Sequence, residues 1–281
     1  MPTVTEKRQT FRELHEGGCF VLPNPWDVGS ARYLQGLGFK ALASTSAGYA
    51  FTRGLPDSAV GRDLMLAHLR ELCAGTDLPI NADFEGGYAH EPERVSENVR
   101  LCIETGVAGL SIEDSTGDPD QPLYDLDTAV ARIRAARAAI DRAGGDTVFT
   151  GRTECFLVGR PDLDEAIQRL KAYAGAGADC LYAPGIRTRE QIDAVVNAVA
   201  PRPVNVLISA ALGMTVPDLA ALGVRRVSVG SALARVGWGA MIRSAKQMID
   251  DGRFDSFADA APHPELNAFF RADAKKRGHE I

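Results

Sequence analysis

Short apolar runs recur along the chain and alternate with longer stretches whose apolar residues repeat with helical periodicity. The runs are continuous in apolar residues, which is typical of strands buried on both faces of a parallel sheet. Strands are predicted near residues 19–23, 41–46, 79–83, 109–114, 147–153, 179–183, 204–209 and 226–230. The clearest helices are predicted at residues 92–105, 127–142, 164–176 and 189–198, with Asp127 and Asp162 or Asp164 as N-terminal cap or first-turn acids.

A glycine follows four of the helical stretches and directly precedes an apolar run, at Gly38, Gly106, Gly177 and Gly223. Glycine adopts the left-handed conformation just past a helix end at little cost. Helix, glycine and strand together form half of a repeating βα unit. The repeat therefore predicts an α/β protein with a single (β/α)8 TIM barrel, and a doubly wound open sheet is the alternative.

The last part of the chain departs from this repeat. Residues 1–240 are expected to form the barrel, and residues 241–281 a C-terminal helical extension of the same domain, with helical stretches around Pro262 and Pro264. Such an extension packs either on a neighbouring subunit or on its own barrel. No Pro/Ser-rich linker or low-complexity segment divides the sequence.

Charge and cysteine content narrow the classes of protein. A formal net charge of −6 and a pI near 5.5 argue against a nucleic-acid partner and against docking on anionic membranes. The five cysteines are scattered without CxxC spacing, which indicates reduced thiols and a cytoplasmic protein. We expect no signal peptide, because the N-terminus is polar and lacks an apolar core. We also expect no membrane span, because no apolar run approaches the roughly 20 residues that a bilayer requires.

Polar residues gather where the predicted strands end, and on a barrel these ends form the active site. In the segment NADFE, Asn81, Asp83 and Glu85 alternate and therefore share one face of an extended chain. Unpaired carboxylates on that face would be very costly in a packed core. The face is therefore either the wet end of the strand or the site of a cation.

Asp83 and Glu113 end neighbouring predicted strands and suggest a hard cation. Together with water they are expected to bind one Mg²⁺, with Mn²⁺ as a substitute. The few histidines and the absence of paired Cys/His spacing disfavour zinc. The alternative interpretation is that both acids are only hydrogen-bonded residues of the barrel mouth.

Arg152 ends the fifth predicted strand and is the natural partner of an anionic substrate. Its planar guanidinium can hold a carboxylate or phosphonate through two hydrogen bonds. A salt bridge to Glu154 or Glu113 is the alternative role. Cys155 is predicted to face the helices as a buried thiol.

Ser46, followed by Ala47 and Gly48, offers a hydroxyl and backbone N–H groups to a second anionic end of a substrate. The alternative is a simple cap between strand and loop. None of the five histidines is well placed as a general base, and His90 is the nearest.

Short motifs follow one another in a characteristic order: PNPWD at residues 23–27, TSAG at 45–48, GLPD at 54–57, NADFEGGYA at 81–89, SIED at 111–114 and GRTE at 151–154. In this order and spacing, from about residue 10 to residue 240, the chain resembles the isocitrate lyase/phosphoenolpyruvate mutase superfamily. The resemblance implies a (β/α)8 barrel, Mg²⁺, and cleavage or formation of a C–C or P–C bond beside a 2-oxo acid. It also implies a helix exchanged between the subunits of a homodimer or homotetramer.

The resemblance assigns roles to individual residues. Asp83 looks like the principal metal-side acid, Glu113 like the acid that reaches the metal through water, and Asp57 like a further acid on metal-bound water. Glu85, which the family pattern does not contain, is expected to be an additional metal-side acid. Arg152 looks like the arginine that holds the anionic end of the substrate, the segment Ser46, Ala47 and Gly48 like the cradle of the 2-oxo carboxylate, and Asn205 is expected to face the pocket. Arg152, Glu113 and Asp57 are therefore the expected catalytic residues.

Two departures from the family pattern bear on activity. The common metal motif of the family begins with Asp, whereas Asn81 stands here and Glu85 is added. Isocitrate and methylisocitrate lyases carry a catalytic cysteine in a KKCGH-type loop after the fourth strand, whereas Ser115–Asp125 contains neither Cys nor Lys. This loop disfavours those lyase activities and weakens a phosphoenolpyruvate mutase assignment.

The sequence therefore predicts a Mg²⁺-dependent lyase that cleaves a C–C bond next to a 2-oxo acid through an enolate. Oxaloacetate decarboxylation is the concrete expectation, because loss of CO2 needs no cysteine acid to begin; Tyr88, Tyr124 or water would protonate the enolate. The alternatives are a phosphonopyruvate hydrolase or other P–C bond enzyme, a divalent-metal aldolase, and a metabolite-binding barrel that has lost catalysis.

Overall fold

Eight parallel strands form the centre of the protein, whose computed structural model describes residues 2–278. They are β1 (Phe20–Leu22), β2 (Leu42–Ala43), β3 (Ile80–Asp83), β4 (Gly109–Glu113), β5 (Val148–Arg152), β6 (Cys180–Tyr182), β7 (Val204–Leu207) and β8 (Arg226–Ser228). Their order is β1-β8-β7-β6-β5-β4-β3-β2, and every pairing is parallel. A backbone hydrogen bond of 3.0 Å from Ala43 N to Pro23 O crosses the seam between the two end strands. The predicted (β/α)8 barrel is confirmed, and the open-sheet alternative was wrong.

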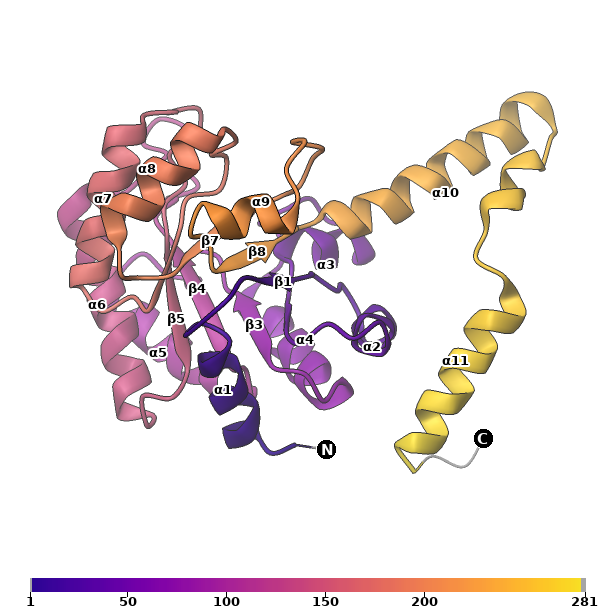
Figure 1. Cartoon of the computed structure of the whole chain (residues 1–281), viewed down its shortest axis with the longest axis horizontal. Coiled ribbons are helices and arrows are strands. Elements are labelled where there is room, and N and C mark those ends of the chain that lie inside the picture. The colour runs from indigo at the N-terminus through magenta and orange to yellow at the C-terminus, as the bar shows by residue number, and fades with distance from the viewer. Residues whose placement is uncertain (1, 279–281) are drawn as a thin grey trace. The chain divides into compact units, whose positions relative to one another are not determined.

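Helices alternate with the strands and surround the barrel (Figure 1). They are α1 (Val4–Glu13), α2 (Val28–Gly36), α3 (Ser46–Thr52), α4 (Arg62–Gly75), α5 (Pro92–Ile103), α6 (Leu126–Arg142), α7 (Leu163–Gly175), α8 (Arg189–Val199) and α9 (Val216–Ala221). Each of the eight predicted strands and four clearest predicted helices corresponds to one of these elements, with ends that differ by up to a few residues. The periodicity of the apolar residues was therefore sufficient to place the repeat.

Local capping explains where the helices begin and end. Asp162 caps α7 through a 2.9 Å hydrogen bond from Glu165 N, and Asp125 caps α6, whose first turn contains Asp127. The four glycines that precede strands have φ between 81° and 105°. An L-residue with a side chain would be strained in this conformation, so these positions favour glycine.

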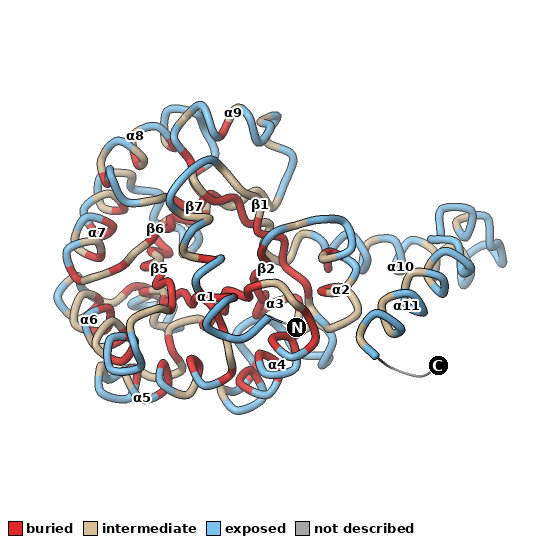
Figure 2. Tube along the Cα trace, turned by 60° about the horizontal axis from the view of Figure 1, so that its bottom comes forward, coloured by how far each residue is buried: buried red, intermediate tan, exposed pale blue. Residues whose placement is uncertain are grey.

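The first helix covers the N-terminal end of the barrel (Figure 2). Phe11 of α1 is fully buried and packs in one apolar cluster with Leu22, Ala43 and Val148 of three strands. Residues with almost no exposed surface also fill the space between the strands and the outer helices, among them Leu42, Ile80, Leu110 and Phe149. The opposite end of the barrel, where the strands terminate, is left to polar residues.

A second compact unit begins at Ala232, after the unit that contains the barrel. Its described part consists of α10 (Ala232–Asp251), the 3₁₀ helix η1 (Asp255–Asp259) and α11 (His263–Lys276), which follows Pro262. Across residues 2–278, no helix combines the length and apolar character that crossing a membrane requires.

Candidate active site

Arg152, the last residue of β5, lies at the centre of a group of carboxylates at the C-terminal end of the barrel. Its Nη1 forms ion pairs with Asp83 Oδ1 at 3.2 Å and with Glu113 Oε2 at 3.1 Å. Its Nε donates to Glu154 Oε1 at 2.5 Å, and the guanidinium lies 5.2 Å from the ring centroid of Tyr182. The salt bridges that were the alternative role for Arg152 are therefore present, and its role in substrate binding stays a prediction.

Ser46 and Asp57 extend this group on the β2 side. The backbone N and the Oγ of Ser46 each donate to Asp83 Oδ2 at 3.0 Å, and Oγ also lies 3.3 Å from Asp57 Oδ1. Ser46 begins α3, whose first turn includes Ala47 and Gly48, and Gly48 N donates to Thr45 Oγ1. The structure thus brings together Asp57, Asp83, Glu113, Arg152 and Ser46, which come from four separate segments of the sequence.

Burial raises the pKa values of Asp57, Glu85, Glu113 and Glu154 in this group. Burial, and then repulsion by Asp83, raises the pKa of Glu85 to about 7. The same causes raise the pKa of Asp57, and burial raises that of Glu113 well above its ordinary value although Arg152 opposes the shift. Five carboxylates, with Glu154 as the fifth, thus share one guanidinium, and the site is short of positive charge.

This shortage of positive charge favours the binding of a divalent cation among the carboxylates. Their donors are carboxylate and hydroxyl oxygens, which are the ligands that Mg²⁺ prefers. Among residues 2–278, no three His, Cys, Asp or Glu side chains are grouped so that they could hold a metal ion directly. Mg²⁺ usually keeps several waters and binds through one or two carboxylates, so the donor set fits Mg²⁺ in that manner. One or two of Asp57, Asp83, Glu85 and Glu113 would bind the ion directly, and the others would hold it through its waters.

Asn81 lies deeper in the barrel than the carboxylates, although it shares a face of β3 with Asp83. Its Oδ1 lies 3.4 Å from Nη1 of the buried Arg226, whose Nε donates to Asn205 Oδ1 at 2.9 Å. The acidic pair of NADFE at the mouth is therefore Asp83 and Glu85. The side chain of Asn81, the first departure from the family motif, therefore lies in the barrel interior.

Asn205 and Asp114 also have partners within the protein. Asn205 Nδ2 donates to Ser228 Oγ at 2.9 Å, so both ends of its amide are engaged, and its role in substrate binding stays a prediction. Asp114 faces α7, where it accepts from Tyr173 Oη at 2.5 Å, and it also accepts from Glu154 N at 2.8 Å. It thereby positions Glu154 against Arg152. Cys155 is fully buried against the helices, as predicted.

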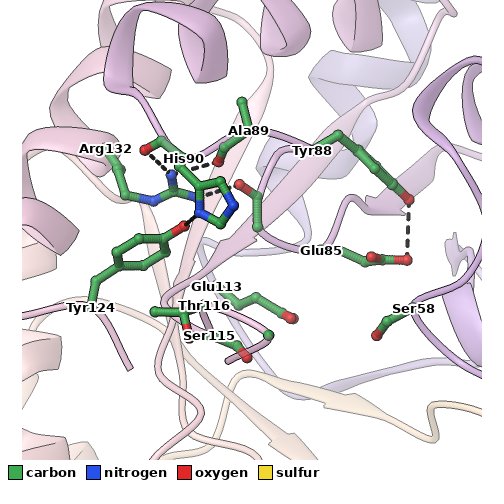
Figure 3. Close-up of a pocket in the computed structure, with 12 residues that line it drawn as sticks. Ser58, Glu85, Tyr88, Ala89, His90, Glu113, Ser115, Thr116, Tyr124 and Arg132 are labelled. Atoms are coloured by element: carbon green, nitrogen blue, oxygen red, sulfur yellow. Dashed lines mark hydrogen bonds between the residues drawn. The ribbon is translucent and has the colours of Figure 1, made fainter. Parts of the chain in front are cut away.

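A cavity of about 270 Å³ opens beside the carboxylates (Figure 3). Glu85 and Glu113 form its boundary with the group around Arg152, and the loop after β4 contributes Ser115, Thr116 and Gly117. The remaining wall consists of Ser58, Gly86, Tyr88, Ala89, His90, Tyr124 and Arg132.

The backbone around this cavity is strained. Among the described residues, Ser58, Glu85 and Tyr88 are the non-glycine residues with positive φ, at 62°, 46° and 56°. All three line the cavity, and Tyr88 Oη donates to Glu85 Oε1 at 3.2 Å. Strained backbone that persists in a folded protein is concentrated at functional sites, which supports the assignment of this cavity as the active site.

Arg132 of α6 fixes the loop that follows β3, and sequence reasoning missed it. Its Nη1 donates to the carbonyl oxygens of Ala89 and His90, at 2.6 and 2.5 Å, and its Nη2 to that of Gly86. The residue is 1% exposed within an amphipathic helix. An arginine at an apolar position of that helix was the signal that could have identified it.

Comparison with known proteins agrees with the fold and identifies the family. The profile of the phosphoenolpyruvate phosphomutase family matches residues 11–249. An oxaloacetate decarboxylase of Paraburkholderia xenovorans is 32% identical over 81% of this chain and 76% of its own length. A crystal structure of a Burkholderia cenocepacia protein, assigned only provisionally as a lyase or mutase, is 48% identical with a TM-score of 0.93, over 95% of this chain and 97% of that one. Oxaloacetate acetylhydrolase in complex with its product oxalate is 28% identical with a TM-score of 0.83, over 98% of each chain.

Proposed function

Since this chain belongs to the phosphoenolpyruvate phosphomutase family, we propose that it is a divalent-cation-dependent lyase that cleaves a C–C bond next to a 2-oxo acid, with oxaloacetate decarboxylation as its reaction. The observation that carries the proposal is the position of Arg152 among Asp83, Glu113 and Glu154, beside a cavity that is also lined by the hydroxyl groups of Ser115, Thr116 and Tyr124. The similarity to an oxaloacetate decarboxylase over most of the chain supports the same reaction.

The charge distribution of the cavity favours loss of CO2. Of the described residues that line it, Arg132 is the sole Lys or Arg, and its Nη groups are engaged with backbone carbonyls. The loop after β4 offers the hydroxyl groups of Ser115 and Thr116. The substrate carboxylate far from Arg152 thus has no free basic side chain beside it, and its conversion to neutral CO2 removes a poorly stabilised charge. A phosphonate dianion at the same place would lack a basic partner.

Different residues of the site would bind the two ends of the substrate. In this proposal Arg152 binds one carboxylate of the 2-oxo acid, and the first turn of α3, at Ser46, Ala47 and Gly48, orients the other end through N–H and hydroxyl groups. A divalent cation, when bound by Asp57, Asp83, Glu85 and Glu113, would supply Lewis-acid stabilisation of the negative charge that develops on the keto oxygen.

The proposal includes a cytoplasmic homodimer or homotetramer. All five cysteines are free, which fits a reducing compartment. Exposed apolar residues on α10, which include Val236, Trp238, Met241, Ile242 and Ile249, fit a surface that a second copy of the chain would cover. Small anionic 2-oxo acids are the proposed substrates.

Proton NMR of oxaloacetate with purified protein tests the reaction, because the methyl signals of pyruvate and acetate are distinct. We expect pyruvate to form faster with protein and Mg²⁺ than with Mg²⁺ alone, and EDTA to remove the difference. Formation of acetate and oxalate would instead show hydrolysis, as the similarity to oxaloacetate acetylhydrolase allows. If the protein binds oxalate but turns over neither oxaloacetate nor phosphonopyruvate, it is a binding protein. If it turns over phosphonopyruvate alone, it is a P–C bond enzyme.

A further inference from the structure

Tyr124 and His90 meet across the cavity from the carboxylates, although 34 positions separate them in the sequence (Figure 3). Tyr124 follows the loop after β4 and His90 the loop after β3, and Nδ1 of His90 forms a short hydrogen bond with Tyr124 Oη. Both residues line the same cavity as Glu85 and Glu113. A molecule in the cavity therefore has carboxylates on one side and a phenol paired with an imidazole on the other.

Arg132 holds this pair in place from behind. Its guanidinium carbon lies 4.2 Å from the ring centroid of Tyr124, and its Nη1 donates to the backbone carbonyls of Ala89 and His90. One buried side chain thus fixes the phenol ring and the backbone of the imidazole together. A cation above a phenol ring also favours the phenolate, so the same contact assists transient loss of the phenol proton.

The histidine connects the phenol to solvent. His90 is exposed, whereas Tyr124 is partly buried, and burial raises the pKa of the Tyr124 phenol. The phenol therefore carries its proton at neutral pH and is available as an acid. The exposed imidazole can then exchange protons with water while its Nδ1 contacts the phenol oxygen.

We propose that Tyr124 is the proton donor of the reaction and that His90 returns the proton to it, an inference that rests on the proposed function. Loss of CO2 leaves the electron pair of the broken C–C bond in an enolate. Tyr124 Oη gives its proton to C3 of this enolate, and a new C–H bond completes the methyl group of pyruvate. Nδ1–H of His90 reprotonates Oη as water gives a proton to Nε2, and exchange with water then returns the imidazole to its Nδ1–H tautomer. One proton therefore enters from solvent for each CO2 released.

Exchange of the pyruvate methyl protons in D2O tests this step apart from loss of CO2, because exchange needs only the proton transfer at C3. With wild-type protein and Mg²⁺, proton NMR is expected to show loss of the methyl signal. In Tyr124→Phe the exchange is expected to fall about 100-fold or more, the range of general acid catalysis, while CO2 release from oxaloacetate falls no more than about tenfold. His90→Asn, which keeps a polar group near the Nδ1 position, is expected to slow exchange.

Two further variants complete the test, and thermal melting establishes that each variant is folded. Tyr33→Phe changes a phenol on α2 outside the cavity and is expected to leave both reactions unchanged. Tyr88→Phe removes the second phenol of the cavity, and loss of exchange there, with exchange retained in Tyr124→Phe, would assign the proton to Tyr88 and overturn the inference. An equal fall of exchange and CO2 release in Tyr124→Phe would also overturn it, since the phenol would then serve binding or folding. A wild-type protein that catalyses neither reaction would contradict the proposed function itself.

Discussion

Asp83 and Glu113 face the same guanidinium nitrogen: Nη1 of Arg152 lies 3.2 Å from Asp83 Oδ1 and 3.1 Å from Glu113 Oε2. The two acids end neighbouring strands whose residues Asp83 and Ser111 are paired in the sheet. Their convergence on one point is the arrangement that a site for a cation and an anionic substrate requires. It also shows that Arg152 carries much of the charge balance of the site.

Arg152→Lys is expected to lower kcat/KM for oxaloacetate by about 10- to 100-fold. Lysine keeps the charge but lacks the planar fork, so it loses charged hydrogen bonds worth about 1.5–3 kcal/mol. Steady-state pyruvate formation measures the effect. Arg100→Lys is the matched control, because Arg100 also pairs with two glutamates but lies exposed on α5. An Arg152→Lys enzyme as active as the Arg100→Lys control would contradict the role of Arg152 in binding substrate.

The stability of the cation-free protein is expected to fall as pH rises through about 7. The pKa of Glu85 is about 7 in the folded protein against 4.5 ordinarily, so its proton stabilises the fold fully below pH 4.5 and is lost as pH rises through 7. The contribution is about 2–3 kcal/mol at most, because the carboxyl is partly exposed. Urea unfolding from pH 5 to pH 8.5 measures it, and Glu85→Gln is expected to flatten the profile.

Mg²⁺ is expected to raise the melting temperature more at pH 8 than at pH 6. A cation binds the deprotonated carboxylates, so at the lower pH a proton competes with the cation for the carboxylate of Glu85. Thermal melts at both pH values, with and without Mg²⁺, measure the difference. An equal gain at both pH values would place the cation away from Glu85.

His68→Phe is expected to leave stability at pH 7.5 unchanged or slightly higher and to reduce sensitivity to acid. His68 stacks on Tyr49 with ring centroids 3.8 Å apart, and its buried Nε2 has no hydrogen-bond partner among the described residues. Burial lowers its pKa to about 4, so the neutral ring stabilises the fold above pH 6.5, and this contribution is lost as pH falls below that value. Phenylalanine keeps the stack and removes the titration.

Acid unfolding between pH 6.5 and pH 4 measures this effect, which is about 2–3 kcal/mol at the lower pH. His263→Gln changes an exposed histidine at the start of α11 and serves as the control. If both variants lose stability with acid as the wild type does, the account of His68 is contradicted.

Gly109→Ala is expected to destabilise the barrel by several kcal/mol. A Cβ at Gly109 would lie 2.6 Å from Phe11 Cε1 and 3.0 Å from the carbonyl oxygen of Val148, where the backbone cannot yield. Gly175→Ala, with nothing within 4 Å of the added Cβ, is the matched control and is expected to be neutral or mildly stabilising. Thermal melting compares the two, and equal melting temperatures would contradict the packing of α1 against β4.

The sequence predicted the strands well because buried parallel strands are continuous apolar runs and their flanking glycines mark helix ends. It also identified Asp83, Glu113 and Arg152, since polar residues at strand ends stand out against apolar bodies. The sequence could not predict how far along the barrel axis each side chain lies. Residues two apart on a strand share a face but lie roughly 6–7 Å apart, so Asp83 is at the mouth and Asn81 is in the interior. Nor could it pair His90 with Tyr124, because Arg132 brings their two loops together through tertiary contacts.

The central claim is that Asp57, Asp83, Glu85 and Glu113 share one divalent cation beside a 2-oxo acid. Crystals grown with Mn²⁺ and oxalate, a mimic of the pyruvate enolate, test it directly through the anomalous signal of manganese. The account predicts one strong peak among these four carboxylates, with oxalate between the ion and the groups of Arg152 and Ser46. Oxalate bound elsewhere, or an ion whose ligands include none of the four carboxylates, would contradict it.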